Sequence, residues 1–254
     1  MELKDAVGIV TGGATGIGHA VCLALAQAGA GGVVVNYSRS VDEANATVAE
    51  LARLGVEALP VKADVSREAE VSAMVDQAAQ HFGRIDVLVN NAGTTRFIPF
   101  PDLDAVTDEV WQAILGVNLM GPWYAARAAA PHLRKSHGCI VNVASIAALR
   151  GSGSSLPYGV SKAALTQLTR SLAVALAPEV RVNAVNPGLV SSRWFRNPFG
   201  DEAATAQEAA MASRTPLKAV ATPAQVAQAV MGFIRSDIVT GQHLVVDGGL
   251  NVTY

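Results

Sequence analysis

A tyrosine, a lysine and a serine stand at a spacing that suits proton transfer. Tyr158 and Lys162 are four positions apart, and Ser145 precedes Tyr158 by thirteen positions. On a helix, residues four apart lie on one face, so the phenol and the ammonium can approach each other. A free tyrosine loses its proton near pH ~10, and a nearby positive charge favours the phenolate. We therefore predict that Lys162 lowers the pKa of Tyr158 toward working pH; an aromatic ring on a core face and a lysine in solvent are the alternative for this pattern alone.

A glycine-rich turn near the start of the chain suits a phosphate. It reads Thr11-Gly12-Gly13-Ala14-Thr15-Gly16-Ile17-Gly18, between an apolar run and an alanine-rich stretch. Glycines there permit a tight turn and a close backbone approach to a pyrophosphate, and the N–H groups at the helix start favour negative charge. The candidate cofactor-binding residues of this turn are Gly12, Thr15, Gly16, Ile17 and Gly18. A plain glycine-rich turn without a ligand is the alternative.

The end of the second apolar run bears on which nucleotide binds. A carboxylate there would hydrogen-bond a ribose diol, whereas a cation would accommodate a 2′-phosphate. The chain reads Asn36-Tyr37-Ser38-Arg39-Ser40, with no acid before Asp42. Ser38 and Arg39 are therefore candidate phosphate contacts, with Tyr37 beside them. This favours NADP(H) over NAD(H), and a solvated Arg39 is the alternative.

Composition bounds the class of protein. Of the 254 residues, 50% are hydrophobic and 16% are charged, which allows a large buried core. The net charge of -2 lacks the basic excess of nucleic-acid-binding domains. No apolar run reaches the roughly 18 residues of a membrane span, and the charged start Met1–Asp5 is unlike a signal peptide. We expect a cytoplasmic protein in which Cys22 and Cys139 are reduced thiols, with a disulfide as the alternative.

Short β-branched runs alternate with longer alanine- and leucine-rich stretches. The predicted strands are Val7–Val10, Gly32–Tyr37, Ala58–Val61, Val87–Asn90, Ile140–Val143, Val182–Val185 and Leu244–Val246. The predicted helices are Ile17–Ala28, Val41–Leu54, Ala69–Phe82, Val106–His132, Tyr158–Ala177 and Pro223–Arg235. This alternation predicts an α/β fold: a single Rossmann domain over residues 1–254, with a doubly wound seven-stranded parallel sheet and helices on both faces. The least regular segment, 191–216, is expected to be a substrate loop or lid and carries Trp194, Phe195, Pro198 and Phe199.

Further motifs follow in the order and spacing of a known family. Asp64 follows the third predicted strand, and Asn90-Asn91-Ala92-Gly93 marks the end of the fourth. Pro187-Gly188 follows the sixth, with Ser191-Ser192 just beyond, and Asn118 lies in the predicted helix Val106–His132. Together with the glycine turn, Ser145, Tyr158 and Lys162, they make the chain resemble the short-chain dehydrogenases/reductases from Thr11 to Gly249. Within that family the resemblance is to 3-oxoacyl-(acyl carrier protein) reductases and related acetoacetyl-CoA or ketone reductases.

The resemblance implies a role for each of four catalytic candidates. Tyr158 would protonate a carbonyl oxygen in reduction or act as the base in oxidation, and Lys162 would stabilise the phenolate and hold the nicotinamide ribose. Ser145 would hydrogen-bond the substrate oxygen, and Asn118 would keep a water beside Lys162. The other implied cofactor contacts are Asp64 and Val65 at the adenine, Asn91, Ala92 and Gly93 along the cofactor, and Pro187, Gly188 and Val190 near the nicotinamide. No metal site is predicted.

One departure from the family pattern concerns the cofactor. NADP(H)-preferring relatives often carry Arg or Lys just before the second glycine of the turn, and Thr15 stands there. Arg39 is then the principal candidate cation, and NAD(H) stays open. His19, which follows the turn, could add partial charge, although a helix-surface histidine is the alternative.

The predicted function is an NADP(H)-dependent oxidoreductase that interconverts a ketone and a secondary alcohol. One alternative is an NAD(H)-dependent dehydrogenase of a hydroxysteroid, sugar or diol. Another is a non-catalytic nucleotide sensor, which would be expected to lose one of the catalytic side chains. An acyl carrier protein as partner would need cations near the pocket. Arg134 and Lys135 offer some charge, but Ala177-Pro178-Glu179 stands where a basic residue is expected, so a carrier-bound substrate is not favoured.

Loop residues bear on the substrate. The arginines expected near the pocket are Arg96, Arg150, Arg193 and Arg196. Convergence of two of them would indicate a substrate with a carboxylate or phosphate; solvated arginines are the alternative. Trp194, Phe195, Phe199 and Phe97 suggest an apolar wall, or else aromatics that pack only on the protein.

Two helical stretches bear on assembly. Asn118–His132 and Tyr158–Ala177 are rich in alanine and leucine around much of their circumference, which suggests burial against a second subunit or ordinary core burial. Relatives commonly pair these two helices and form tetramers, with a second contact near a C-terminal end such as Asp247-Gly248-Gly249-Leu250. We therefore expect a homotetramer.

Overall fold

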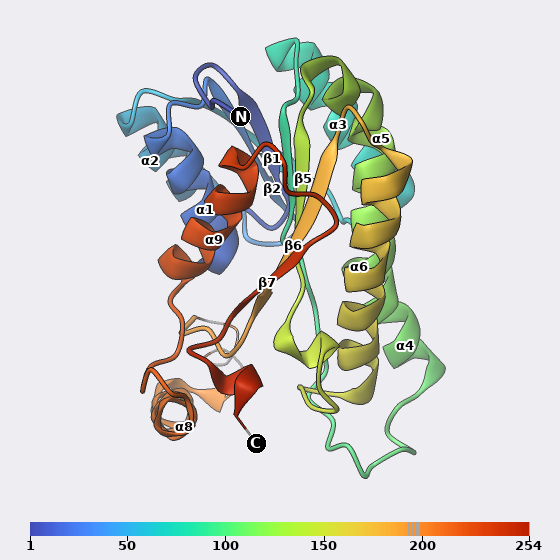
Figure 1. Cartoon of the computed structure of the whole chain (residues 1–254), viewed down its shortest axis with the longest axis vertical. Coiled ribbons are helices and arrows are strands. Elements are labelled where there is room, and N and C mark those ends of the chain that lie inside the picture. The colour runs from blue at the N-terminus through green and yellow to red at the C-terminus, as the bar shows by residue number, and fades with distance from the viewer. Residues whose placement is uncertain (193, 195, 197–198, 254) are drawn as a thin grey trace.

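A parallel sheet of seven strands forms the centre of the molecule (Figure 1). The computed structural model describes residues 1–192, 194, 196 and 199–253. The strands are β1 (Val7–Val10), β2 (Gly32–Tyr37), β3 (Glu57–Lys62), β4 (Val87–Asn90), β5 (Cys139–Val143), β6 (Arg181–Pro187) and β7 (His243–Val246). They lie in the order β3-β2-β1-β4-β5-β6-β7, and every neighbouring pair is parallel. The predicted Rossmann architecture is confirmed.

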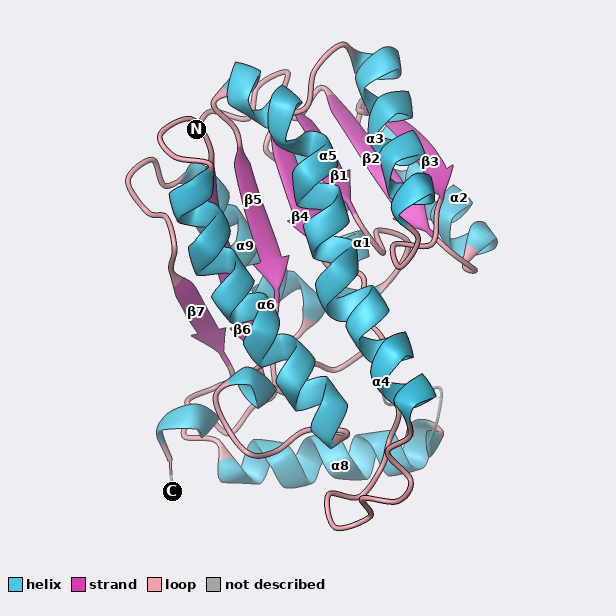
Figure 2. Ribbon diagram, turned by 90° about the vertical axis from the view of Figure 1, so that its right-hand side faces the viewer, coloured by secondary structure: helices cyan, strands magenta, loops and turns pink. Residues whose placement is uncertain are grey.

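Helices cover both faces of the sheet (Figures 1 and 2). One layer holds α1 (Gly16–Gln27), α2 (Val41–Arg53) and α9 (Pro223–Arg235); the other holds α3 (Glu68–Phe82), α5 (Gly121–Ser136) and α6 (Leu156–Ala175). Successive side chains of a strand point to opposite faces: Val10 packs in the first layer and Ile9 in the second. Burial on both sides is why these strands read as continuous apolar runs.

The strand order reverses beside β1, which pairs with both β2 and β4. In such sheets a ligand binds in the crevice outside the carboxyl ends of the strands at this reversal. The glycine turn follows β1 and the Asn91–Gly93 segment follows β4, so both motifs end at this point. The topology therefore brings the predicted phosphate turn next to the Asn91–Gly93 segment that follows β4.

The helix predicted over Val106–His132 is interrupted. The chain forms α4 (Asp108–Leu115), then a π-helical turn at Gly116–Met120, and then α5, which continues to Ser136. A π-helical turn places one extra residue in the helix and is frequent at functional sites. Asn118 lies inside this turn. The apolar periodicity of the sequence on either side gives no sign of the extra residue, so the turn was not predicted.

The segment expected to be the least regular contains a helix, α8 (Asp201–Arg214), so the prediction of an irregular segment was wrong there. The sequence DEAATAQEAAMASR is rich in good helix formers, and Asp201 and Glu202 in the first turn complement the helix dipole, as does Arg214 in the last. Only Ala204 of this helix is buried, so no apolar stripe marked it in the sequence. Helix α8 runs across the carboxyl edge of the sheet (Figure 2).

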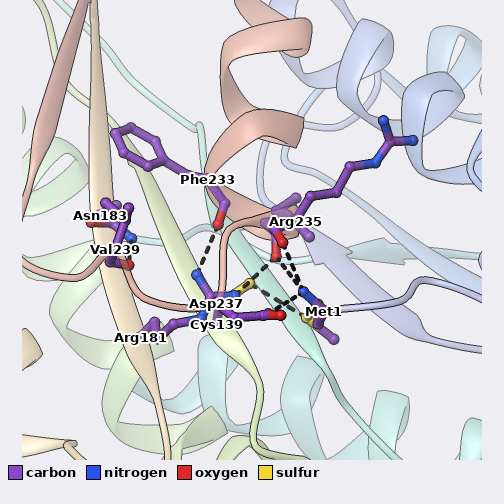
Figure 3. Close-up of polar contacts among 9 residues, drawn as sticks. Met1, Cys139, Arg181, Asn183, Phe233, Arg235, Asp237 and Val239 are labelled. Carbon is purple, nitrogen blue, oxygen red and sulfur yellow. Dashed lines mark hydrogen bonds and ion pairs between the residues drawn. The ribbon is translucent and has the colours of Figure 1, made fainter.

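Cations close the far end of α9 (Figure 3). Arg181 at the start of β6 donates to the carbonyl oxygens of Phe233 and Ile234, at 2.8 and 2.9 Å. The ammonium of Met1 donates to the Arg235 carbonyl at 3.0 Å and pairs with Asp237. Positive charge at a helix C-terminus complements the helix dipole and satisfies its last carbonyl groups. These contacts fix α9 against the sheet.

Cys22 and Cys139 are buried free thiols, as predicted. Within the described part of the chain, no helix combines the length and the apolar composition needed to cross a bilayer.

Candidate active site

The catalytic candidates gather where β5 ends and α6 begins. Ser145 follows β5, and its Oγ accepts from the Ala147 amide at 3.1 Å, which caps a short 3₁₀ turn. Helix α6 begins after Ser155, whose Oγ accepts from the Tyr158 amide at 3.4 Å. A serine cap of this kind satisfies an amide that the first turn leaves free. Tyr158 therefore enters on a fixed first turn, facing Ser145.

Ser145 acts on the ionisation of Tyr158. Desolvation of the partly buried hydroxyl raises the pKa of Tyr158, and the smaller effect of the Ser145 side chain, which favours the phenolate, does not offset it. For the chain as described, the prediction of a lowered tyrosine pKa was wrong. Burial outweighs the effect of Ser145, and Lys162 is not among the causes of the shift.

Lys162 lies one turn further along α6 and is only 4% exposed. Its Nζ donates to the Val143 carbonyl oxygen at 2.9 Å and lies 5.8 Å from the centre of the Tyr158 ring. Burial lowers its pKa from 10.5 to about 8, so the ammonium is still mostly protonated at neutral pH. Among the described residues no carboxylate pairs with it, which leaves its charge available beside Tyr158.

Asn118 holds two segments of the site together. Its Oδ1 accepts from the Thr94 amide at 2.8 Å, and its Nδ2 donates to the Thr94 carbonyl and to Ser161 Oγ, both at 3.0 Å. Ser161 in turn donates to the Tyr158 carbonyl at 2.7 Å. The Asn118 side chain thus connects the loop after β4 to α6. The sequence reading missed Thr94 and Ser161, because neither has a spacing that marks it.

Gly93 lies between these groups. A Cβ at this position would be 3.6 Å from Asn118 Oδ1 and 3.7 Å from Lys162 Nζ. The predicted residues Gly93, Asn118 and Lys162 are therefore brought together. That Asn118 keeps a water beside Lys162 stays a prediction.

The glycine turn needs glycine for two separate reasons. Gly12 and Gly16 have φ values of +61° and +56°, which L side chains rarely adopt. A Cβ on Gly18 would lie 2.2 Å from the Gly12 carbonyl oxygen, so no larger residue fits there. Around Gly16 a Cβ would meet nothing within 4 Å, so the turn is open on that side.

Neighbouring strands lock this turn in place. Asn91 Nδ2 donates to the carbonyl oxygens of Thr11 and Gly12 at 2.9 and 3.1 Å, and Thr11 Oγ1 accepts from the amides of Asn91 and Ala92. Asn36 Oδ1 accepts from the Gly12 amide at 3.1 Å. Thr11 and Asn36 lie in segments that the sequence analysis singled out, but neither was predicted as a site residue. Asn36 leaves a signal, because it is a buried amide next to the last residue of an otherwise apolar strand.

Known proteins resemble the chain over its whole length. A family profile described as enoyl-(acyl carrier protein) reductase matches residues 12–251. Ketoacyl reductase 2 of the granaticin polyketide synthase of Streptomyces violaceoruber is 48% identical over 247 residues, which cover 97% of this chain and 96% of that protein. A crystal structure of a short-chain dehydrogenase/reductase from Burkholderia xenovorans superposes with a TM-score of 0.90 at 36% identity, covering 98% of both chains.

The chain belongs to the short-chain dehydrogenase/reductase family. It is accordingly an NAD(P)-dependent oxidoreductase. Another relative in the family is versicolorin reductase 1 of Dothistroma septosporum, 35% identical over 259 residues, which cover 98% of this chain and 97% of that protein.

In this short-chain dehydrogenase/reductase, the segment after β2 that is predicted to select the nucleotide is exposed. Tyr37 is half-buried, whereas Ser38 and Arg39 are exposed after β2. Within the described residues no hydrogen bond or ion pair engages the Arg39 guanidinium. Asp64, two residues beyond the end of β3, accepts from the Ser66 amide and hydroxyl at 2.9 and 2.7 Å, which fixes its carboxylate.

The nicotinamide end predicted from the family packs against the C-terminal turn. Pro187 ends β6 and pairs with Val246 of β7. A Cβ on Gly188 would lie 2.8 Å from Asp247 Cβ, so the close approach requires glycine. Val190 is buried and forms a bridge with Ala221.

The loop arginines of the enzyme do not converge where the structure describes them. Arg150 donates to the carbonyl oxygens of Leu250 and Thr253, at 3.0 and 2.9 Å. Arg196 pairs with Asp201 and Glu208, and Arg96 is exposed. Arg193 lies outside the described residues. The guanidinium groups of Arg150 and Arg196 thus bind groups within the protein.

Aromatic side chains do meet near the site. Phe97 and Phe199 contact edge to face, with ring centres 4.8 Å apart, and Trp194 lies 6.3 Å from the Tyr158 ring. Phe195 and Pro198 lie outside the described residues. In the described part of the chain, no group of three or more His, Cys, Asp or Glu residues could hold a metal ion.

Proposed function

We propose that this enzyme is an NADP(H)-dependent reductase that interconverts a ketone and a secondary alcohol, with Tyr158 as the acid. The observation that carries the proposal is the buried ammonium of Lys162, which lies 5.8 Å from the centre of the Tyr158 ring, with Ser145 acting on the Tyr158 hydroxyl. A phenol, a hydroxyl and a fixed positive charge in one place are what protonation of a carbonyl oxygen requires. The ketoacyl and versicolorin reductases among the relatives support a ketone as substrate.

The residues present fit a dinucleotide. The positive end of α1 lies behind the glycine turn and carries no acidic residue in its first turn. Open space around Gly16 leaves the backbone accessible to a pyrophosphate. Gly12, Thr15, Gly16, Ile17 and Gly18 would hold the phosphates; Asp64 and Val65 would bracket the adenine; Asn91, Ala92, Gly93, Pro187, Gly188 and Val190 would line the rest. The bound cofactor supplies the hydride that the carbonyl carbon accepts.

The chain's own residues move the proton. Because Ser145 Oγ accepts from the Ala147 amide, its own hydrogen is free to point at Tyr158 or at a substrate oxygen. The Tyr158 phenol donates its proton to the carbonyl oxygen as the alcohol forms. The Lys162 ammonium then stabilises the phenolate, and Asn118 holds the loop and helix that carry these groups. Oxidation of the alcohol reverses each transfer.

Absorbance at 340 nm tests this function. Purified enzyme should consume NADPH when a ketone such as ethyl acetoacetate or a small diketone is added, and should consume it more slowly without the ketone. Absence of turnover across a panel of aliphatic and aromatic ketones, with either NADPH or NADH, would contradict the proposal.

Arg39→Ala tests the preference for NADP(H). We expect this variant to bind NADPH about tenfold more weakly, since it loses one charge-assisted contact to the 2′-phosphate. NADH affinity should stay within about twofold, because NADH has no such phosphate. Both affinities are measured by titrating the enzyme with each nucleotide. Arg53→Ala, at the end of α2, is the matched control. Unchanged NADPH affinity in Arg39→Ala would remove the proposed contact and leave the NAD(H) alternative.

We also propose a homotetramer built on α5 and α6. Val174 on α6 is 82% exposed, and the half-buried Trp123 and Tyr124 lie on α5. Apolar surface of this kind suits a second copy. Light scattering should give a mass near four chains of 26.2 kDa, and Val174→Glu should lower it. A monomer in the unmodified protein would overturn this.

A further inference from the structure

Glu208 on helix α8 accepts hydrogen bonds from two residues of the segment that precedes the helix, Ser191 and Arg196. Glu208 Oε2 accepts from Ser191 Oγ at 2.9 Å, and Glu208 Oε1 accepts from Arg196 Nη2 at 3.1 Å. The Glu208 side chain is only 17% exposed, whereas Asp201, the other partner of Arg196, is 87% exposed. Ion pairs weaken as water gains access, so Glu208 is the stronger anchor of the two.

Trp194 stands between these two anchored residues. Its ring centre is 6.3 Å from that of Tyr158, and the two planes meet at 51°. A Cβ on Gly93 would lie 3.8 Å from Trp194 Cη2 and 3.7 Å from Lys162 Nζ. The indole therefore lies beside the Tyr158 ring and close to Gly93.

The two ends of this segment are held differently. The Ser191 amide donates to the Ala221 carbonyl at 2.9 Å, and Val190 bridges to Ala221, so backbone bonds fix the first end. At the second end the Arg196 carbonyl accepts from the Gly200 amide at 2.8 Å, and the Arg196 side chain reaches Glu208 and the exposed Asp201. Loss of the Glu208 carboxylate would leave the backbone bonds in place and remove one side-chain contact at each end, to Ser191 and to Arg196.

We propose that Glu208 is a positioning residue, which holds Trp194 against Tyr158 so that the indole forms one wall of the ketone site. The expected effect on the KM for the ketone rests on the proposed function, whereas the expected effect on the exposure of Trp194 does not. Glu208 does not reach the reacting atoms; it acts through Ser191 and Arg196. Because Trp194 takes no part in proton transfer, the wall should affect binding of the ketone more than the chemical step.

Fluorescence tests the structural part without cofactor or substrate. The chain has three tryptophans, so Trp111→Phe and Trp123→Phe together leave Trp194 as the sole emitter. In that background Glu208→Ala should make Trp194 fluorescence markedly more sensitive to acrylamide, as for an exposed indole. Glu208→Gln keeps the shape of the side chain and should give an intermediate result. Asp201→Asn, which removes a first-turn charge and the exposed contact to Arg196 but keeps the Glu208 pair, is the control and should leave quenching unchanged.

Kinetics test the second part. Glu208→Ala should raise the KM for the ketone about tenfold, as expected for loss of charge-assisted bonds, while kcat changes about twofold or less. The charge-reversed double variant Glu208→Arg with Arg196→Glu should recover much of the KM, because it restores the pair in the opposite sense. Unchanged quenching and unchanged KM in Glu208→Ala would overturn the role of Glu208. Quenching that rises as expected in an enzyme whose activity survives Tyr158→Phe would instead refute the proposed function.

Discussion

Tyr158→Phe should lower kcat/KM for ketone reduction by about 10²–10⁴-fold, the range typical of a lost general acid. The substitution removes one hydroxyl and keeps the ring that packs near Trp194. Ser145 keeps its bond from the Ala147 amide, so the site should stay assembled. NADPH consumption at 340 nm measures the rate, and nucleotide titration should show nearly unchanged affinity.

Two comparisons make this result specific. Tyr124→Phe removes the same hydroxyl from a tyrosine on α5 and should have no effect on the rate. In the unmodified enzyme, alcohol oxidation should accelerate as pH rises, because it needs the phenolate and burial raises the pKa of Tyr158. Tyr158→Phe should lose that dependence. Equal rates in the unmodified enzyme and Tyr158→Phe would rule out the proposed mechanism.

The central strands were predictable because burial on both faces leaves an unambiguous pattern. β1 and β4 carry apolar residues at nearly every position, and their bounds match the predicted ones. β6 extends to Pro187. The prediction ended at Val185 because Asn and Pro, the types of Asn186 and Pro187, are uncommon inside strands. Their pairing with Val245 and Val246 of β7 comes from the neighbouring strand. Local composition therefore fixes the strand centres, and tertiary pairing decides the ends.

The sequence did not predict helix α8 or the π-helical turn, and the physical reasons differ. Helix α8 is nearly all exposed, so it lacks the apolar periodicity on which the prediction depended. The π-helical turn at Asn118 sits between two well-formed helices, and its extra residue is fixed by bonds to Thr94 and Ser161. Neither feature is encoded by a local pattern.

In the candidate site, too, only some residues were predictable from the sequence. The residue types and spacing of Tyr158, Lys162 and Ser145 indicate their chemistry. Asn36 and Glu208 act by accepting hydrogen bonds from groups 24 and 12 to 17 positions away in the chain. Such partners meet only once the sheet and its helices have formed. Sequence motifs thus name the reacting groups, and the structure adds the residues that hold them.

Lys162→Met should separate the chemical role of this lysine from its effect on stability. Activity should fall about 10²–10³-fold, as for loss of one electrostatic contact to the developing charge. The pKa of the buried ammonium is lowered from 10.5 to about 8. Below pH 8 both the folded and the unfolded chain carry the charge, so the folded state bears the full desolvation penalty. Between pH 8 and 10.5 only the folded chain has released the proton, so this residue makes the unmodified enzyme more stable as pH rises.

Lys162→Met lacks this dependence. Its free energy of unfolding, measured with urea, should therefore fall relative to that of the unmodified enzyme by up to about 3 kcal/mol between pH 7 and pH 10.5. Taking the difference between the two proteins cancels the ionisation of every other group. Lys135→Met, which removes an exposed lysine from α5, should show no such trend. A difference that stays constant with pH would mean that Lys162 ionises alike in the folded and unfolded chains, which would contradict a buried ammonium beside Tyr158.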